Sequence, residues 1–259
     1  MLYIEIPVRY GREIADPGLE SAEANLRYGH LRWRLPTAET ALVLVNCWAY
    51  FPLQSFVDRV DEICRTKIRP ALAACRALGV TVAHAPSPQW AANYREFHFA
   101  TPPEAKSEEP GASPGDWPPA TGEFAVPRTG AEPGFKAWRE KITAADLKIA
   151  APVEPAGDDI VVSTGDQLHA LCRQRRIKHL LYAGFASNIC VLERDYGVKA
   201  MKQRGYNIVL LRDGTTAIES SETVGGLWAT RSAVFYVELK IGVSTTAADL
   251  VEACRTAEA

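Results

Sequence analysis

Short apolar runs alternate with stretches of helical spacing along most of this chain. One uninterrupted run is Ala41-Leu42-Val43-Leu44-Val45, and another, Leu180-Leu181-Tyr182-Ala183, ends at Gly184. Runs of this kind are typical of strands that are buried on both faces of a sheet. Strands that alternate with helices are joined by right-handed crossovers and form a parallel sheet between two helical layers. We therefore expect an α/β fold, a three-layer sandwich with a mostly parallel sheet of about six strands.

The same patterns place the individual elements. The expected strands are 3–8, 41–45, 80–84, 160–162, 179–183, 207–211 and 240–243. The expected helices are 55–78, 166–175, 188–204, 219–236 and a last one that begins with the capping box at 246–249. Pro70 should interrupt the first helix, because it has no N–H to donate. The chain is expected to form a single domain, 1–259, with residues 1–38 as an N-terminal arm.

Residues 86–157 break this alternation. Prolines and glycines recur there, as at Pro102-Pro103 and Pro133-Gly134, among scattered aromatic residues such as Trp90 and Trp138. A segment of this length without clear periodicity is usually a functional insertion, a lid or a disordered loop. Disordered segments are usually poor in aromatic residues. We therefore expect an ordered insertion that covers the sheet edge, an active site or a partner subunit.

Composition narrows the function classes. The formal net charge is -2 and no long run of Lys or Arg occurs, which argues against nucleic acid and against a polybasic membrane contact. No apolar stretch is long enough for a membrane span and the N-terminus lacks signal-peptide features, so the expected location is the cytoplasm. The six cysteines are widely spread without a C-x-x-C pair, which disfavours a zinc ribbon, an iron–sulfur cluster or a disulfide framework.

Cys190 stands where a predicted strand passes into a predicted helix. It follows the strand that ends near Gly184 and a short polar turn. A thiol in the first turn of a helix meets unpaired backbone N–H groups and the positive end of the helix dipole, which favour the nucleophilic thiolate. Free cysteines are also among the most buried residue types, so a structural role fits the local pattern as well.

Polar residues follow several of the expected strands. In open parallel sheets, ligands bind beyond the carboxyl ends of the strands, so these residues are site candidates. They are Asn46, His84, Ser163, the turn 185–190 and Asp213. His84 could serve as the base of a Cys–His pair, although a hydrogen-bonded structural histidine fits equally well. Asn46 could orient a substrate amide or carbonyl group, or it could be only a turn residue after the strand.

One motif extends over the end of a strand, a turn and the start of a helix: Gly184-Phe185-Ala186-Ser187-Asn188-Ile189-Cys190-Val191, followed by Asp195 and Leu211-Arg212-Asp213. From about residue 40 to the end, outside the insertion, the chain resembles the isochorismatase-like cysteine hydrolases, which include nicotinamidases. The resemblance implies their fold, with Cys190 as the nucleophile and Phe185, Ala186 and Ser187 in the turn beside it. It also implies an oxyanion hole made by the N–H groups of Ala186 and Cys190, next to a cis peptide bond between Phe185 and Ala186.

Two positions depart from the family pattern. The resemblance implies an Asp after the first core strand, which takes the thiol proton, and a Lys near the third core strand, which stabilises charge. This chain has Asn46 at the first position, and an amide cannot accept a proton at neutral pH. At the second position, Ser163-Thr164-Gly165-Asp166-Gln167-Leu168 contains no Lys. The absence of both the Asp and the Lys makes physical sense, because removal of one charge alone would leave the other buried and unpaired.

Further residues are candidates for the walls and charges of a pocket. Trp48 and Trp90 could wall it, although aromatic residues in such segments more often pack than contact a ligand. Asp166 could supply a carboxylate near the missing Lys, but it fits better as a helix N-cap. Metal-binding relatives carry an Asp-x-His pair in the loop after the first core strand. The loop 48–54 has neither residue here, so no metal and no cofactor is expected.

Two functions remain open on the sequence. The first is a hydrolase that attacks a C–N, amide-type bond of a small molecule through Cys190. The second is a catalytically silent binding or scaffolding module, which the absence of the family Asp and Lys favours. Vinyl-ether hydrolysis, which some relatives perform with the strand-end acid, ranks last because Asn46 replaces that acid. The resemblance also implies a homo-oligomer, either a dimer or a tetramer.

Overall fold

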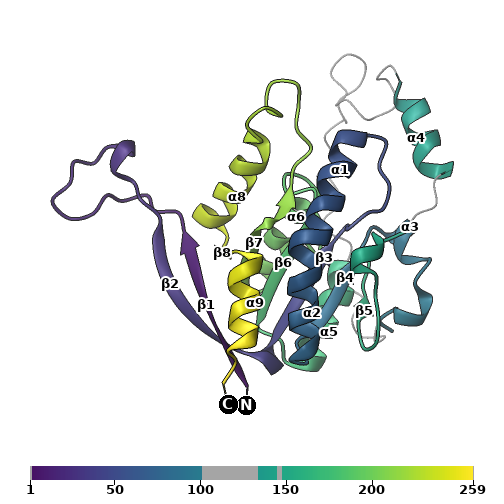
Figure 1. Ribbon diagram of the computed structural model, residues 1–259, viewed down its shortest axis with the longest axis horizontal. Coiled ribbons are helices and arrows are strands. Elements are labelled where there is room, and N and C mark those ends of the chain that lie inside the picture. The colour runs from purple at the N-terminus through teal and green to yellow at the C-terminus, as the bar shows by residue number, and fades with distance from the viewer. Residues whose placement is uncertain (1, 101–133, 145–147, 259) are drawn as a thin grey trace, which may run out of the picture.

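The computed structural model describes residues 2–100, 134–144 and 148–258. Among these residues, eight strands form one sheet in the order β2-β1-β8-β7-β6-β3-β4-β5 (Figure 1). The strands are β1 (Tyr3–Tyr10), β2 (Gly29–Pro36), β3 (Thr40–Val45), β4 (Thr81–Ala85), β5 (Ile160–Val161), β6 (His179–Phe185), β7 (Asn207–Thr216) and β8 (Val243–Thr245). The strands from β8 to β5 are parallel, whereas β1 runs antiparallel to both β2 and β8. The predicted α/β fold with a mostly parallel sheet is confirmed, and the arm adds the two extra strands.

The two apolar runs form neighbouring strands at the centre of the sheet. Every residue of β3 is buried, and so is every residue of β6 after the first. Their register pairs Val43 with Tyr182 and Val45 with Gly184. At Gly184 the backbone has a φ of +118°, and a Cβ there would lie 1.9 Å from the carbonyl oxygen of Val45. Glycine is therefore required where β6 leads into the turn that carries Cys190.

The first long helix contains a π-turn near the predicted interruption. α1 (Gln54–Ile63), the π-turn Cys64–Ile68 and α2 (Arg69–Ala77) follow one another without a gap. A π-turn changes the spacing of the backbone hydrogen bonds, so the missing N–H of Pro70 at the start of α2 is tolerated. The other described helices are α3 (Pro88–Ala91), α4 (Phe135–Ala144), α5 (Gly165–Arg175), α6 (Cys190–Glu193), α7 (Val198–Gln203), α8 (Trp228–Lys240) and α9 (Ala247–Arg255). Short 3₁₀ turns lie at Glu23–Asn25, Thr37–Glu39, Arg95–Phe97 and Ala151–Val153.

Helices cover both faces of the sheet. α1, α2 and α9 lie together in front of the sheet in Figure 1, where α2 packs against α9, whereas α5 and α6 lie behind it. The front helices bury Phe56 and Leu72, and α5 and α7 bury Leu168 and Met201. This arrangement gives the three expected layers. Among the described residues, no helix combines the length and apolar character needed to cross a bilayer.

Two predicted helices have different bounds in the structure. The stretch 188–204 divides into α6 and α7, because the chain leaves the helix at Arg194 with extended backbone, at φ -64° and ψ 155°. Gly197 closes the turn that follows, and its N–H donates to Arg194 O at 2.7 Å. The helix expected at 219–236 begins only at Trp228. It continues to Lys240, which places β8 at 243–245 instead of 240–243.

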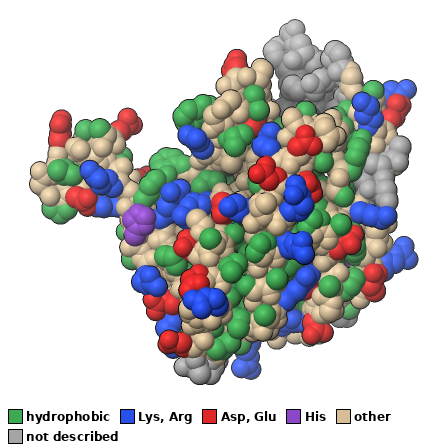
Figure 2. All heavy atoms as spheres, in the orientation of Figure 1, with side chains coloured by type: hydrophobic (Ala, Val, Ile, Leu, Met, Phe, Trp, Pro, Cys, Tyr) green, Lys and Arg blue, Asp and Glu red, His purple; other side chains and the backbone are tan. Residues whose placement is uncertain are grey.

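The N-terminal arm is a β-hairpin, although the sequence predicted one strand there. β1 and β2 pair antiparallel, with Ile6 opposite Trp33, and β1 joins the sheet beside β8. The connection 11–28 projects away from the body (Figures 1 and 2). β2 is an edge strand in which Leu31, Trp33 and Leu35 alternate with polar residues, a strand pattern that the sequence prediction missed.

The insertion 86–157 is described in part. Residues 101–133 and 145–147 lie outside the described residues, so the expected order of that part, with Pro102-Pro103, stays a prediction. α3 and α4 flank 101–133, and both line the pocket described next.

Candidate active site

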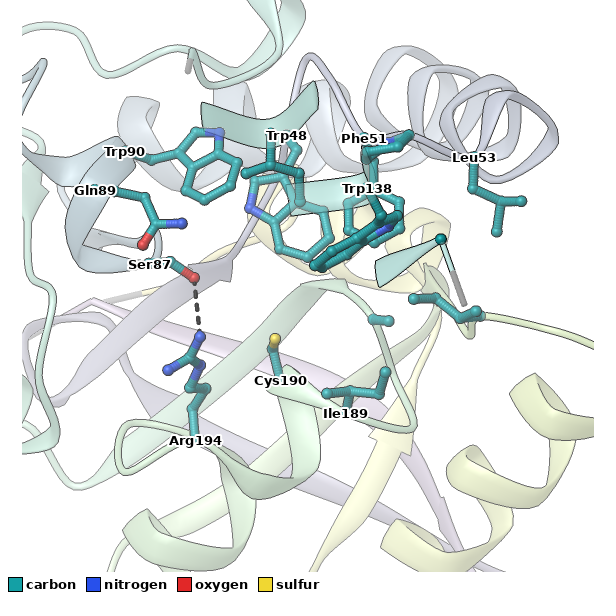
Figure 3. A pocket seen from close by; sticks show the side chains of 15 residues that line it. Trp48, Phe51, Leu53, Ser87, Gln89, Trp90, Trp138, Ile189, Cys190 and Arg194 are labelled. Atoms are coloured by element: carbon teal, nitrogen blue, oxygen red, sulfur yellow. Dashed lines mark hydrogen bonds between the residues drawn. The ribbon is translucent and has the colours of Figure 1, made fainter. Parts of the chain in front are cut away.

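A pocket of about 560 Å³ lies at the carboxyl ends of the parallel strands (Figure 3). Its lining comes mainly from the segments that follow β3, β4 and β6, and from α4. The side chains that matter for the chemistry below are the polar Ser87, Gln89, Cys190 and Arg194 and the aromatic Trp48, Phe51, Trp90 and Trp138. Ligands of open parallel sheets bind at this edge.

Cys190 lies in this pocket as the first residue of α6. It is 6% exposed. The N–H groups of Ile189 and Val191 both donate to Ala186 O at 3.1 Å. The N–H of Cys190, between them in sequence, donates to no group among the described residues. One backbone donor beside the sulfur therefore remains available to a bound molecule.

The turn before Cys190 contains the cis peptide bond that the family resemblance implies, between Phe185 and Ala186. Ala186 lines the pocket, and its N–H also donates to no described group. Phe185 is fully buried and packs edge-on against Phe56, with 6.4 Å between the ring centroids. Ser187 N donates to the carbonyl at the end of β7 at 2.9 Å. Packing on one side and a sheet hydrogen bond on the other thus fix the turn.

Asn46 follows β3 and is fully buried, with its backbone in the left-handed region at a φ of 45°. Its Oδ1 accepts hydrogen bonds from Ser87 N at 2.7 Å and from Ser87 Oγ at 3.2 Å. Its Nδ2 is buried and has no partner among the described residues. Asn46 therefore ties the end of β3 to the segment after β4, although its side chain is not part of the pocket lining.

Arg194 is the functional candidate that sequence reasoning missed. Its Nη2 donates to Ser87 Oγ at 3.2 Å, and its side chain lines the pocket together with Cys190 (Figure 3). Burial alone would lower the pKa of Arg194, but Tyr196 and Cys190 outweigh it and raise that pKa. The only signal in the sequence is its spacing of four residues from Cys190, which puts both side chains on one side of a helical turn.

The opposite side of the pocket is aromatic. Trp48 stacks on Phe51, with ring centroids 5.2 Å apart and 6° between the planes, and Trp90 lies 5.7 Å from Trp48. Trp138 of α4 meets Phe51 edge-on at 6.0 Å. We call these four side chains the aromatic wall. The indole N–H groups of Trp48 and Trp90 are buried without a partner among the described residues, so the wall also offers polar donors.

His84 belongs to a different cluster. Its Nε2 lies 2.8 Å from Asp159 Oδ2, and Arg76 Nη2 lies 2.5 Å from the same oxygen. Burial is the largest effect on His84 and lowers its pKa, so the imidazole is neutral near pH 7. Burial alone would raise the pKa of Asp159, but hydrogen bonds from His84 and Arg76 outweigh it and lower that pKa. His84 is not among the residues that line the described pocket.

The other strand-end candidates also have structural partners. Asp166 pairs with Arg204 at 2.7 Å and does not line the described pocket. Its predicted role as the N-cap of α5 is wrong, because Thr164 occupies that position and accepts from Gln167 N. Asp213 accepts a hydrogen bond from the backbone N–H that opens α9, at 2.8 Å.

The pocket therefore combines a thiol and a guanidinium with backbone donors. Its described lining contains no carboxylate, histidine or lysine. Across residues 2–100, 134–144 and 148–258, no cluster of three or more His, Cys, Asp or Glu is arranged to hold a metal ion. Such a site can support nucleophilic attack by sulfur on a carbonyl group whose oxygen is bound by backbone N–H groups.

The fold of this chain is similar to the folds of several solved structures. The structure is similar to a cysteine hydrolase from Pseudomonas syringae pv. phaseolicola 1448A, with a TM-score of 0.56 and 17% identity over 87% of this chain and 96% of that chain. It is also similar to an isochorismatase family protein from Burkholderia thailandensis (TM-score 0.47, 18% identity, 85% of this chain and 97% of that chain). A nicotinamidase from Staphylococcus aureus matches with a TM-score of 0.40 and 12% identity, over 78% of this chain and 93% of that chain.

The sequence itself supplies the family assignment. No curated protein matches it. The family model described as the isochorismatase domain matches residues 40–238, which is most of the chain. This protein therefore belongs to the isochorismatase family, and that membership supports a hydrolase.

Proposed function

We propose that this protein hydrolyses a C–N, amide-type bond of a small molecule, with Cys190 as the nucleophile. The observation that carries the proposal is the position of Cys190 at the pocket, beside two backbone N–H groups that no described residue uses. The aromatic wall would hold the apolar part of the substrate, and Ser87 and Gln89 are polar groups on the lining that could hold its amide.

The reaction follows from these positions. The sulfur of Cys190 attacks the carbonyl carbon, and the oxyanion accepts hydrogen bonds from the N–H groups of Ala186 and Cys190. The C–N bond then breaks, the leaving nitrogen takes up a proton from the solvent that received the thiol proton, and a thioester remains. Water adds to the thioester, the C–S bond breaks, and the carboxylic acid leaves as the thiol regains a proton.

A catalytically silent binding protein is the second candidate. The described lining contains no side chain that would accept the thiol proton near neutral pH, since Asn46 replaces the family Asp and His84 lies elsewhere. The same pocket would then bind a small molecule without turning it over. For either function we propose a homo-oligomer of two or four chains, which light scattering on the purified chain would measure.

The test is amine or ammonia release from a panel of small amides by the full chain, compared with Cys190→Ala. Cys254→Ala is a matched control, because Cys254 is also 6% exposed but lies on α9, away from the pocket. Release that depends on Cys190 and survives Cys254→Ala would support the hydrolase. Undiminished release in Cys190→Ala would overturn it. Absence of release with tight binding of panel members would favour the binding protein.

A further inference from the structure

We propose that Arg194 is a catalytic residue, the cation that stabilises the thiolate of Cys190, and that Ser87 and Asn46 are positioning residues that hold it in place. The inference rests on the proposed function, because it takes Cys190 as the reacting group. The family resemblance implies a lysine after the third core strand for a related task, and that position is empty of lysine here. Arg194 comes from another segment, the turn after α6.

Local structure directs Arg194 back toward Cys190. α6 ends at Glu193, and Arg194 takes an extended conformation while its N–H still donates to Cys190 O at 3.2 Å. Gly197 is needed for this turn, because a Cβ there would lie 2.8 Å from the carbonyl oxygen of Val191. The turn thus keeps Arg194 one helical turn after the sulfur, and Figure 3 shows both side chains on the same side of the pocket.

A chain of hydrogen bonds fixes the guanidinium. Ser87 Oγ donates its proton to Asn46 Oδ1 at 3.2 Å and accepts from Arg194 Nη2 at the same distance. Ser87 N also donates to Asn46 Oδ1, so both donors of Ser87 converge on one buried acceptor. Ser87 and Asn46 are 3% and 0% exposed, which leaves this chain little freedom to move. A charged aspartate at position 46 would instead compete with the thiolate for the guanidinium.

The charge of Arg194 is not neutralised by a carboxylate. Within the described part of the chain it forms no ion pair, and the titratable groups that face it are Cys190, Tyr196 and Asp195. Asp195 accepts the N–H of Gly165 at 2.6 Å, at the start of α5. Burial raises the pKa of Tyr196 to about 12, so its hydroxyl is neutral at working pH. Among these three groups, Cys190 is the one that lines the described pocket together with Arg194, so its sulfur is the group that the guanidinium can stabilise as an anion there.

The chemical step is the loss of the thiol proton to solvent. The guanidinium stays protonated at any working pH and donates to the resulting thiolate, which a charge-assisted hydrogen bond stabilises. An opposite charge in contact moves such a titration by about one to three pH units. Near neutral pH, loss of Arg194 should therefore reduce the thiolate population, and with it the rate of alkylation, about tenfold or more.

The experiment measures the pH profile of alkylation of Cys190 by iodoacetamide, without any substrate. Peptide mass spectrometry separates Cys190 from the five other cysteines. The variants are Arg194→Gln, Arg194→Lys, Ser87→Ala and the control Arg231→Gln, whose guanidinium lies over Trp228 at 4.9 Å and outside the described pocket lining. Circular dichroism and thermal melting check that each variant is folded.

We expect the midpoint of the Cys190 profile to move upward by about one unit or more in Arg194→Gln and by less in Arg194→Lys, which keeps the charge. Ser87→Ala should give a smaller upward shift, and Arg231→Gln none. Equal midpoints in folded wild type, Arg194→Gln and Arg194→Lys would overturn the inference. Because no substrate is used, an Arg194-dependent profile without amide turnover would sink the proposed function alone, and Cys190-dependent turnover with an unchanged profile would sink this inference alone.

Discussion

Replacement of Asp159 by asparagine should destabilise the fold while leaving Cys190 reactive. The Asp159 side chain is 4% exposed and its carboxylate is shared by Arg76 and His84. Its Oδ2 also accepts the N–H of Ala156 at 3.2 Å. Asparagine keeps the shape but removes the charge, so Arg76 loses its anionic partner and His84 loses a strong acceptor.

The expected loss of stability depends on how deeply each member of the Asp159–Arg76 ion pair is buried. Removing one member of a buried ion pair destabilises by roughly 3–5 kcal/mol. The Arg76 side chain is 33% exposed, so water solvates part of its charge and the loss should be smaller. We expect a decrease of about 2–3 kcal/mol in the free energy of unfolding. For a chain of this size that corresponds to a decrease of about 5–10 °C in Tm.

The assay is urea unfolding followed by tryptophan fluorescence, with the alkylation rate of Cys190 measured on the folded variants. Asp61→Asn is the matched control, because the Asp61–Arg65 pair has a 2.9 Å contact but both side chains are about half exposed. It should change stability by about 0.5 kcal/mol or less. A change in Asp159→Asn no larger than in the control would refute the burial argument. A selective loss of Cys190 reactivity in folded Asp159→Asn would show that His84 acts on the site.

Three further predictions concern the turn, the histidines and the aromatic wall. Gly184→Ala should destabilise by about 3 kcal/mol or more in urea unfolding, because its Cβ would overlap the Val45 carbonyl at a positive φ; a loss under about 1 kcal/mol would contradict this. Burial lowers the pKa of His84, His169 and His179, so the unfolded chain binds more protons than the folded one below about pH 6.5. Stability should therefore fall as the pH decreases from 7 toward 5, and a flat urea midpoint over that range would be inconsistent with lowered pKa values for these three histidines. Trp138→Ala should raise KM about tenfold with little change in Tm, since Trp138 is 39% exposed and lines the pocket; an unchanged KM would remove it from the substrate site.

Much of the core could be predicted because its strands are buried on both faces. The runs that became β3 and β6 carry almost no polar residue, so one sequence window suffices to recognise each. β2 was missed although Leu31, Trp33 and Leu35 alternate with polar residues there, because the surrounding residues 1–38 show no sustained periodicity. α8 shows a third case: the turn before Trp228 contains Gly225 and Gly226, and the helix begins only after them.

The residues of the candidate site also differ in how far the sequence alone could predict them. Cys190 and the turn before it could be found because one contiguous motif carries them. Arg194 could not, because its partner Ser87 is 107 residues away in the sequence and only the fold brings the two together. His84 shows the converse error: it lies near the carboxyl end of β4, where a site residue was expected, but its side chain is bound to Asp159.

The most direct test of the central claim is to look for an acyl group on Cys190. The full chain would be mixed with a panel of N-acyl p-nitroanilides, quenched with acid within the first turnover, and analysed by intact mass and peptide mapping. The account predicts a mass increase equal to the acyl group on the peptide that contains Cys190, together with p-nitroaniline release, and neither in Cys190→Ala. p-Nitroaniline release that continues unchanged in Cys190→Ala, with no acyl group on Cys190 in the wild type, would contradict it.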